Sequence, residues 1–169
     1  MIESWYALIG DLVQSRREHQ RAALAQQIEH ALRTANEQFI TDWIAPLETT
    51  RGLDEVSSLL RTPRHAFDAA MTVNLHVWPA RFRFALAHGS VDVGDPGDPA
   101  SDFDGPAFHR AADSLDRARR QRKPLAIDIR GGEKRIVNLA EATAQLHHAI
   151  VADWTPRACE VVRLVREST

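Results

Sequence analysis

The segment RFRFALAHG at residues 81–89 constrains the fold of this chain more than any other feature. Charged and apolar residues alternate in it with a period of two, which is the repeat of a β-strand with one buried and one solvated face. A strand of this kind is typical of antiparallel sheets that are covered on one side only. We therefore expect a sheet with helices packed on one face and the other face open.

Apolar periodicity, prolines and glycines predict the remaining elements. A mostly apolar run at 5–13 predicts a buried strand, and Ser15 has the capping-box spacing to Glu18 at the start of a long helix that reaches Phe39. The other expected elements are two short strands within 46–60, a helix from Pro63 to Pro79, a helix from Pro106 into the basic run 117–123, a strand at 125–129, a helix at 137–153 and a last short helix from Thr155 and Pro156. Residues 90–105 are expected to form the longest loop.

This order contains the split β-α-β pattern of ferredoxin-like and palm domains. We predict an α+β fold of this type, with an antiparallel sheet, for residues 1–135. Residues 136–169 are expected to form a C-terminal helical extension. The length of 169 residues fits one domain with its own core.

Composition excludes several classes of protein. The net charge of −2 gives no basic field that would attract nucleic acid, so nucleic acid is not an expected partner of this chain alone. The single cysteine, Cys159, cannot form an internal disulfide, which suits a reducing compartment. The chain has neither a membrane-spanning apolar run nor a signal peptide pattern, so we expect a cytoplasmic protein without membrane contact.

The first candidate site is IGDLVQSR at residues 9–16, where Asp11 stands near the end of a buried strand. A carboxylate in such a place is costly unless it is paired or binds a cation. Ser15 and Arg16 follow at the expected start of a helix, where free N–H groups favour phosphate. The alternative is an aspartate that pairs locally and has no further role.

The second candidate is the pair Asp54 and Glu55, on the connection between two strands. In a split β-α-β fold this connection lies beside the first strand, which would bring Asp54 close to Asp11. Neighbouring carboxylates repel each other, and a divalent cation such as Mg²⁺ relieves the repulsion. The alternative is a turn with solvated acids.

The third candidate is the segment from 88 to 110, in which His88, Asp104 and His109 could line the open end of a nucleotide cleft. Their spacing is not a zinc signature, because no cysteine or HExxH-type pair accompanies them. A solvated flexible loop is the alternative for the acids of this segment.

Five segments together resemble the SatD family of bacterial proteins over nearly the whole chain. They are YALIGDLVQSR (6–16), LDEVSSLL (53–60), RFRFALAHGSVD (81–92), FDGPAFHRA (103–111) and ADWTPRACEVVRLV (152–165). The name of the family is associated with acid tolerance, so the resemblance implies a regulatory or stress-related protein rather than a defined reaction.

The same order of segments also resembles class III nucleotidyl cyclase and GGDEF palm domains. That likeness implies two divalent metals held by Asp11 and Asp54, which would bind the phosphates of a nucleotide. Leu53 stands where a glycine is expected, and His109 and Asp113 stand where cyclases carry an Asn and an Arg that steadies the transition state. A degenerate nucleotide cleft without cyclase activity is therefore expected.

The C-terminal segment WTPRACEVVRLV resembles the opening helix of a helix-turn-helix module in SatD relatives. No recognition helix follows before Thr169, and without one nothing can enter a major groove. This supports an alternative function, a non-enzymatic homodimeric module for interaction or transcription whose DNA-binding part is missing here.

Overall fold

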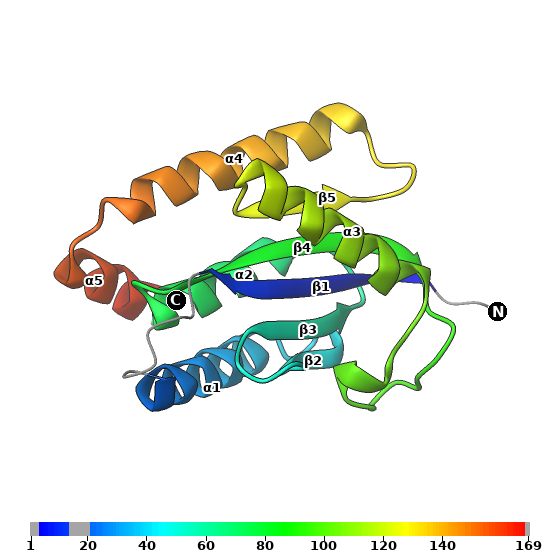
Figure 1. The fold of residues 1–169 in the computed structure, drawn as a ribbon, viewed down its shortest axis with the longest axis horizontal. Helices are drawn as coiled ribbons and strands as arrows, with labels where there is room; N and C mark the ends of the chain where they lie inside the picture. Colours follow the sequence, from blue (N-terminus) through cyan, green and yellow to red (C-terminus); the bar gives the residue numbers. More distant parts are fainter. Residues whose placement is uncertain (1–3, 14–20, 168–169) are drawn as a thin grey trace.

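Five strands form one sheet in the order β2-β3-β1-β4-β5, with β1 at its centre (Figure 1). The computed structural model describes residues 4–13 and 21–167. The elements are β1 (Ser4–Val13), α1 (Arg21–Gln38), β2 (Trp43–Thr49), β3 (Glu55–Leu60), α2 (Ala66–Val77), β4 (Arg81–Ser90), the short 3-10 helix η2 (Ala100–Asp102), α3 (Pro106–Gln121), β5 (Leu125–Asp128), α4 (Lys134–Ala152) and α5 (Pro156–Glu167). The chain therefore has an α+β fold.

Strand β1 pairs antiparallel with β3 on one side and, over its whole length, with β4 on the other. Strand β2 continues the antiparallel pairing beyond β3. Strand β5 instead runs parallel to β4, so the sheet is mixed and the prediction of an antiparallel sheet is wrong at this edge. The reason is α3, which carries the chain back along the sheet and so makes a β-α-β crossover between β4 and β5.

Helices cover both faces of the sheet, so the prediction of one open face is wrong. Helices α1 and α2 pack on one face, which we call the α1/α2 face, where Leu8, Val56 and Phe82 are buried. Helix α3 packs on the opposite face, the α3 face, against Ala7 and Ala85, and Figure 1 shows it in front of the sheet with α2 behind.

The alternating residues of β4 explain why one open face was predicted and why α3 nevertheless covers that face. Arg81 and Arg83 are the charged positions, and they precede the part of the strand that α3 covers. The same face continues with Ala85 and Ala87, whose small side chains let a helix approach closely. A period of two identifies the faces of a strand, but small residues on the second face allow it to be covered as well.

The edge strand β2 begins at Trp43, earlier than the predicted start at residue 46. Pro46 lies inside it, and the register with β3 shifts on both sides of Ala45. Proline has no N–H for a ladder and is tolerated at sheet edges, so it interrupts the pairing without ending the strand. The predicted N-cap of α1, Ser15, lies outside the described residues; the described part of the helix starts at Arg21.

Helix α4 lies beside the edge strand β5, and helix α5 packs against α2. Helix α4 starts at Lys134, three residues before the predicted 137, and Ala144 is its one buried residue. Helix α5 contacts α2 through the buried Cys159 and an ion pair of 3.0 Å between Arg166 and Asp68. In the described part of the chain no helix has the length and apolar character needed to cross a membrane.

A glycine sets the distance between α3 and the sheet. A Cβ atom at Gly89 would lie 2.8 Å from the backbone nitrogen of Ala107 in α3. We expect Gly89→Ala to lower the free energy of unfolding by about 1–3 kcal/mol, because backbone on both sides must shift. Urea unfolding measures the change. Ser90→Ala, one residue away, adds no group and should stay within about 0.5 kcal/mol of the wild type; equal stability of all three proteins would contradict the close contact.

Candidate functional site

Asp11 lies on the α3 face near the end of β1, within a row of charged residues. Its cross-strand partners are Glu55 on β3 and Arg83 on β4. Directly opposed residues of antiparallel strands point to the same face and interact. The pairing of three strands therefore brings two acids and a base together from distant parts of the sequence.

Two arginines hold the Asp11 carboxylate. Arg83 Nη1 donates to Oδ2 at 3.3 Å, and Arg119 on α3 donates to the same oxygen from Nε at 3.2 Å and from Nη2 at 3.1 Å. The side chains of Asp11 and Arg83 are only 16% and 13% exposed. Because a shielded carboxylate needs a compensating charge, these guanidinium groups neutralise Asp11 in this structure.

Asp54 has a separate partner. Its carboxylate lies 3.8 Å from Arg21 of α1, and its backbone oxygen accepts a hydrogen bond from Leu12 at 2.8 Å. Helix α1 packs on the α1/α2 face, whereas Arg119 reaches Asp11 from the α3 face. The two carboxylates therefore contact arginines from helices on opposite sides of the sheet.

Each of the three predicted metal ligands has an arginine partner in the structure. On the α3 face the strand pairing brings Asp11 and Glu55 together, and Glu55 also lies 3.8 Å from Arg51. Within residues 4–13 and 21–167, no three His, Cys, Asp or Glu side chains are grouped to hold a metal. Ser15 and Arg16, predicted to hold phosphate, lie outside the described residues.

The other three predicted site residues lie at the opposite end of β1. His88 pairs with Tyr6, five residues before Asp11 and roughly 17 Å away at 3.3 Å per residue. The exposed side chains of Asp104 and His109 lie near this end, with 3.1 Å between Oδ1 and Nε2. The structure therefore does not bring these residues together with Asp11 in one cleft.

A bidentate ion pair between Arg110 and Asp128 lies at this opposite end of the sheet. Arg110 donates from Nη2 and Nε to the two oxygens of Asp128, at 2.6 and 2.9 Å, and from Nη1 to the backbone oxygen of His88 at 2.6 Å. These hydrogen bonds hold the pKa of the Asp128 carboxyl below its usual value. The pair joins α3 to β4 and β5, which is a structural role.

A basic hollow lies beside Asp11, where β4 begins and α3 leads into β5. Its cationic lining side chains are Arg81, Arg83, Arg122, Lys123 and, when protonated, His148. Lys123 is paired with Glu141 of α4 at 2.8 Å, and Arg83 is paired with Asp11. The hollow is small, about 20 Å³, so the charges of Arg81 and Arg122, which no carboxylate of the described residues pairs, are available to an anion at its rim rather than inside it.

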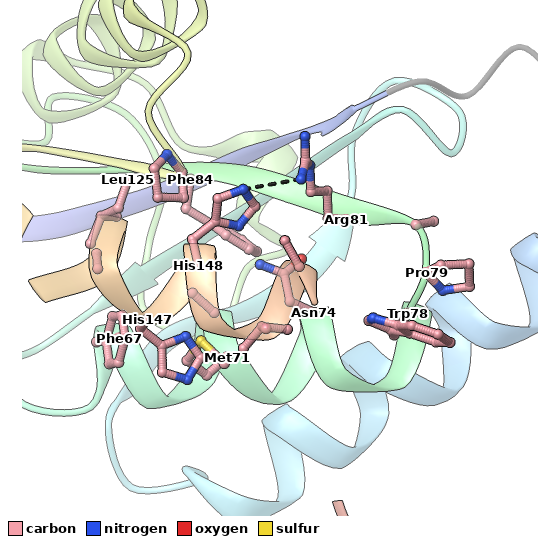
Figure 2. A pocket seen from close by; sticks show the side chains of 16 residues that line it. Phe67, Met71, Asn74, Trp78, Pro79, Arg81, Phe84, Leu125, His147 and His148 are labelled. Atoms are coloured by element: carbon pink, nitrogen blue, oxygen red, sulfur yellow. Dashed lines mark hydrogen bonds between the residues drawn. The ribbon is translucent and has the colours of Figure 1, made fainter. Parts of the chain in front are cut away.

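An apolar cavity of about 170 Å³ lies next to this hollow, between α2, α4 and the starts of β4 and β5 (Figure 2). Phe67 and His147 lie at one end of the view, and Trp78 with Pro79 at the other. Asn74 is fixed in the wall, since its side chain donates to the backbone oxygen of Phe82 at 3.1 Å and accepts from its nitrogen at 2.6 Å.

Arg81, Pro124 and His148 line both the basic hollow and the apolar cavity, so the two are contiguous. Arg81 Nη1 lies 3.0 Å from Nε2 of His148, as the dashed line in Figure 2 shows. Burial, and then the charge of Arg81, lower the pKa of His148. Burial and Arg166 lower the pKa of His147. Both rings are therefore neutral at pH 7, and His148 Nε2 accepts the hydrogen bond from Arg81.

Sequence reasoning missed the two histidines and the arginine partners of Asp11. Arg83 was visible as a charged position in an alternating strand, but its contact with Asp11 depends on strand register. Arg119 is 108 positions from Asp11 along the chain, so no local pattern connects them. His147 and His148 sit in an amphipathic helix in which the sequence gives no sign of a cavity.

The fold and this site define an α+β protein with a five-stranded mixed sheet and a basic hollow that opens beside an apolar cavity. The model of the SatD family matches residues 5–167, and the chain belongs to that family. Among curated proteins, none matches the chain.

The two cavity histidines predict a stability that falls on acidification. Their folded pKa values lie below the ordinary 6.5, so the unfolded chain binds protons more readily. The stability they contribute is complete above pH 6.5 and is lost as the pH falls through the folded pKa values. Melting temperatures measured against pH should decline in this range. His148→Gln should flatten the decline, and His109→Gln, at the exposed opposite end, should leave it unchanged; the reverse would contradict the assignment.

Proposed function

We propose that this chain is a regulatory protein that binds a nucleotide where the basic hollow meets the apolar cavity. One observation carries the proposal: Arg81, Pro124 and His148 belong to both spaces. A ligand that spans them needs an apolar ring at one end and an anionic group at the other. Nucleotides combine these two features.

The cavity has the size and chemistry for the base. An apolar cavity of about 150 Å³ accepts benzene, so about 170 Å³ suits a small heterocycle. Trp78, Phe67 and Phe84 offer aromatic contact surface, and the neutral His147 and His148 can exchange hydrogen bonds with ring nitrogens. Pockets with an apolar lining and a few polar groups are typical of small-molecule sites.

The phosphates would bind to the guanidinium groups at the rim. Arg81 and Arg122 line the hollow without a carboxylate partner among the described residues, while Arg83 shares its charge with Asp11. Arginine forms bidentate hydrogen bonds to phosphate. In this proposal Asp11 is an internal counter-ion that orients Arg83 and Arg119, and phosphate binding needs no metal.

The proposed role is regulatory because this chain has other residues where the cyclases it resembles carry their catalytic residues. His109 and Asp113 stand in place of the Asn and Arg that the resemblance to cyclases implies. His109 also lies at the opposite end of β1 from Asp11 and pairs with Asp104. An anion at position 113 would repel a phosphate rather than stabilise it, so we propose binding without cyclase chemistry.

Calorimetry with ATP, GTP and inorganic pyrophosphate tests the proposal. Arg81→Ala should weaken the binding of nucleotide and pyrophosphate alike by about tenfold or more, because a charge-assisted hydrogen bond is lost. Val151→Phe, which fills the cavity, should weaken only the nucleotides. Arg61→Ala removes an exposed arginine at the far end of β3 and is the matched control. Absence of binding in the wild-type protein would refute the proposal.

Asp11→Asn separates this proposal from the Mg²⁺ site expected from the sequence. If Asp11 is a counter-ion, its neutralisation frees positive charge, and nucleotide affinity should stay equal or rise with or without Mg²⁺. If Asp11 is a metal ligand, affinity should depend on Mg²⁺ and collapse in this variant. A loss of nucleotide affinity in Asp11→Asn is thus expected only if Asp11 is a metal ligand.

A second function, the homodimeric interaction module, is favoured by a separate observation. Most of the exposed large apolar side chains of the described residues lie on α4 and α5, away from the sheet. Such a concentration is typical of a surface that contacts another protein.

A further inference from the structure

Helix α4 carries a row of large apolar side chains that face solvent. They are Ile136, Leu139, Leu146 and Ile150, and each is between 54% and 68% exposed. Single exposed apolar residues are common, but a contiguous row along one helix marks an interaction surface. No element of the described chain covers this row.

The spacing of the row is that of a coiled-coil seam. Together with the exposed Thr143, the residues follow one another at intervals of three, four, three and four positions, as a and d positions of a heptad do. The opposite side of the helix faces the protein, where Ala144 is buried and Glu141 accepts a hydrogen bond from the backbone of Ile127. The seam lies on the flank of α4: Ile136, Leu139 and Thr143 also border an apolar groove shared with α2 and the sheet, whereas Leu146 and Ile150 face solvent away from it. These five residues form the α4 seam.

We propose that the α4 seam binds the α4 seam of a second copy of this chain, with the two helices antiparallel. Reversal of the helix about its middle places Leu139 opposite Ile150 and Thr143 opposite Leu146 of the copy. Each contact then occurs twice, as in a two-fold symmetric interface. The four positions from Leu139 to Ile150 are thus complementary to their own reverse, and Ile136 lies at the outer end beside Asp153 of the copy.

Charge at the two ends of α4 supports the antiparallel arrangement. Arg135 stands at the start of the helix and Asp153 directly after its end, and both side chains are exposed. Neither has an ion-pair partner within the described residues. Reversal brings Arg135 of each copy beside Asp153 of the other, whereas a parallel pair would set like charges together.

Small residues flank the seam and allow close approach. Ala142 and Ala149 occupy the positions next to it, where longer side chains would hold two helices apart. An apolar groove beside the seam, lined by Phe67, Ile127 and Ile129 among others, offers further surface to the second copy. The proposal is independent of the nucleotide site, because Leu146 and Ile150 line neither the cavity nor the hollow.

Sedimentation equilibrium of the complete chain tests the proposal. The wild type should show twice the mass of one chain, and Leu146→Glu should raise the dissociation constant at least about 30-fold, because a charge enters the centre of the seam in both copies. Ile40→Glu, at an equally exposed apolar residue of the α1–β2 connection, should leave the dimer intact. A monomeric wild type, or dissociation in both variants alike, would overturn the proposal.

Crosslinking tests the orientation. With Cys159 buried, Thr143→Cys provides one accessible thiol near the proposed two-fold axis, and mild oxidation should join two chains through it. Gln145→Cys, on the other side of the same helix, should remain uncrosslinked. Charge reversal should weaken the dimer in Arg135→Asp and restore it when Asp153→Arg is added. Crosslinking through position 145 alone, or no rescue in the double variant, would refute the antiparallel seam.

Discussion

The pairing of β1 with β4 over ten residues is the constraint on which the rest of the structure depends. It fixes which side chains of both strands share a face, because a shift by one residue would exchange the two faces. It directs Leu8 and Phe82 toward α1 and α2, and Ala7 and Ala85 toward α3. It also sets Arg83 beside Asp11. The register of β1 against β4 thus determines the apolar core on each face and the position of Arg83 next to Asp11.

Much of this architecture could be predicted from the sequence. The alternating segment at 81–89 became β4, and EVSSLL became β3, because period and composition report directly on local structure. The direction of β5 and the position of α3 could not be predicted in this way. They depend on whether a second sheet face is small and apolar enough to accept a helix, which is a property of several strands together.

Part of the candidate site could likewise be predicted from the sequence, and part of it could not. A carboxylate at the end of a buried strand was recognisable at Asp11, and its need for a positive partner followed from elementary electrostatics. The identity of that partner was not accessible, since Arg83 depends on register and Arg119 on the packing of α3. The cavity between α2 and α4 could not be predicted either, because a cavity forms where side chains of separate elements leave space unfilled, and this depends on the packing of the whole fold. The proposed nucleotide site therefore lies beside the residues that the sequence singled out.

Both edges of the sheet are closed to strand addition within the described residues. At one edge, Pro46 lacks an N–H and the register of β2 is irregular on either side of Ala45. At the other, β5 is only four residues long, and the N–H of Ile127 is already bonded to Glu141. Unprotected edges recruit further strands and lead to aggregation. A sheet protected in this way resists amyloid-like growth and leaves helical surfaces as the route by which the protein can assemble.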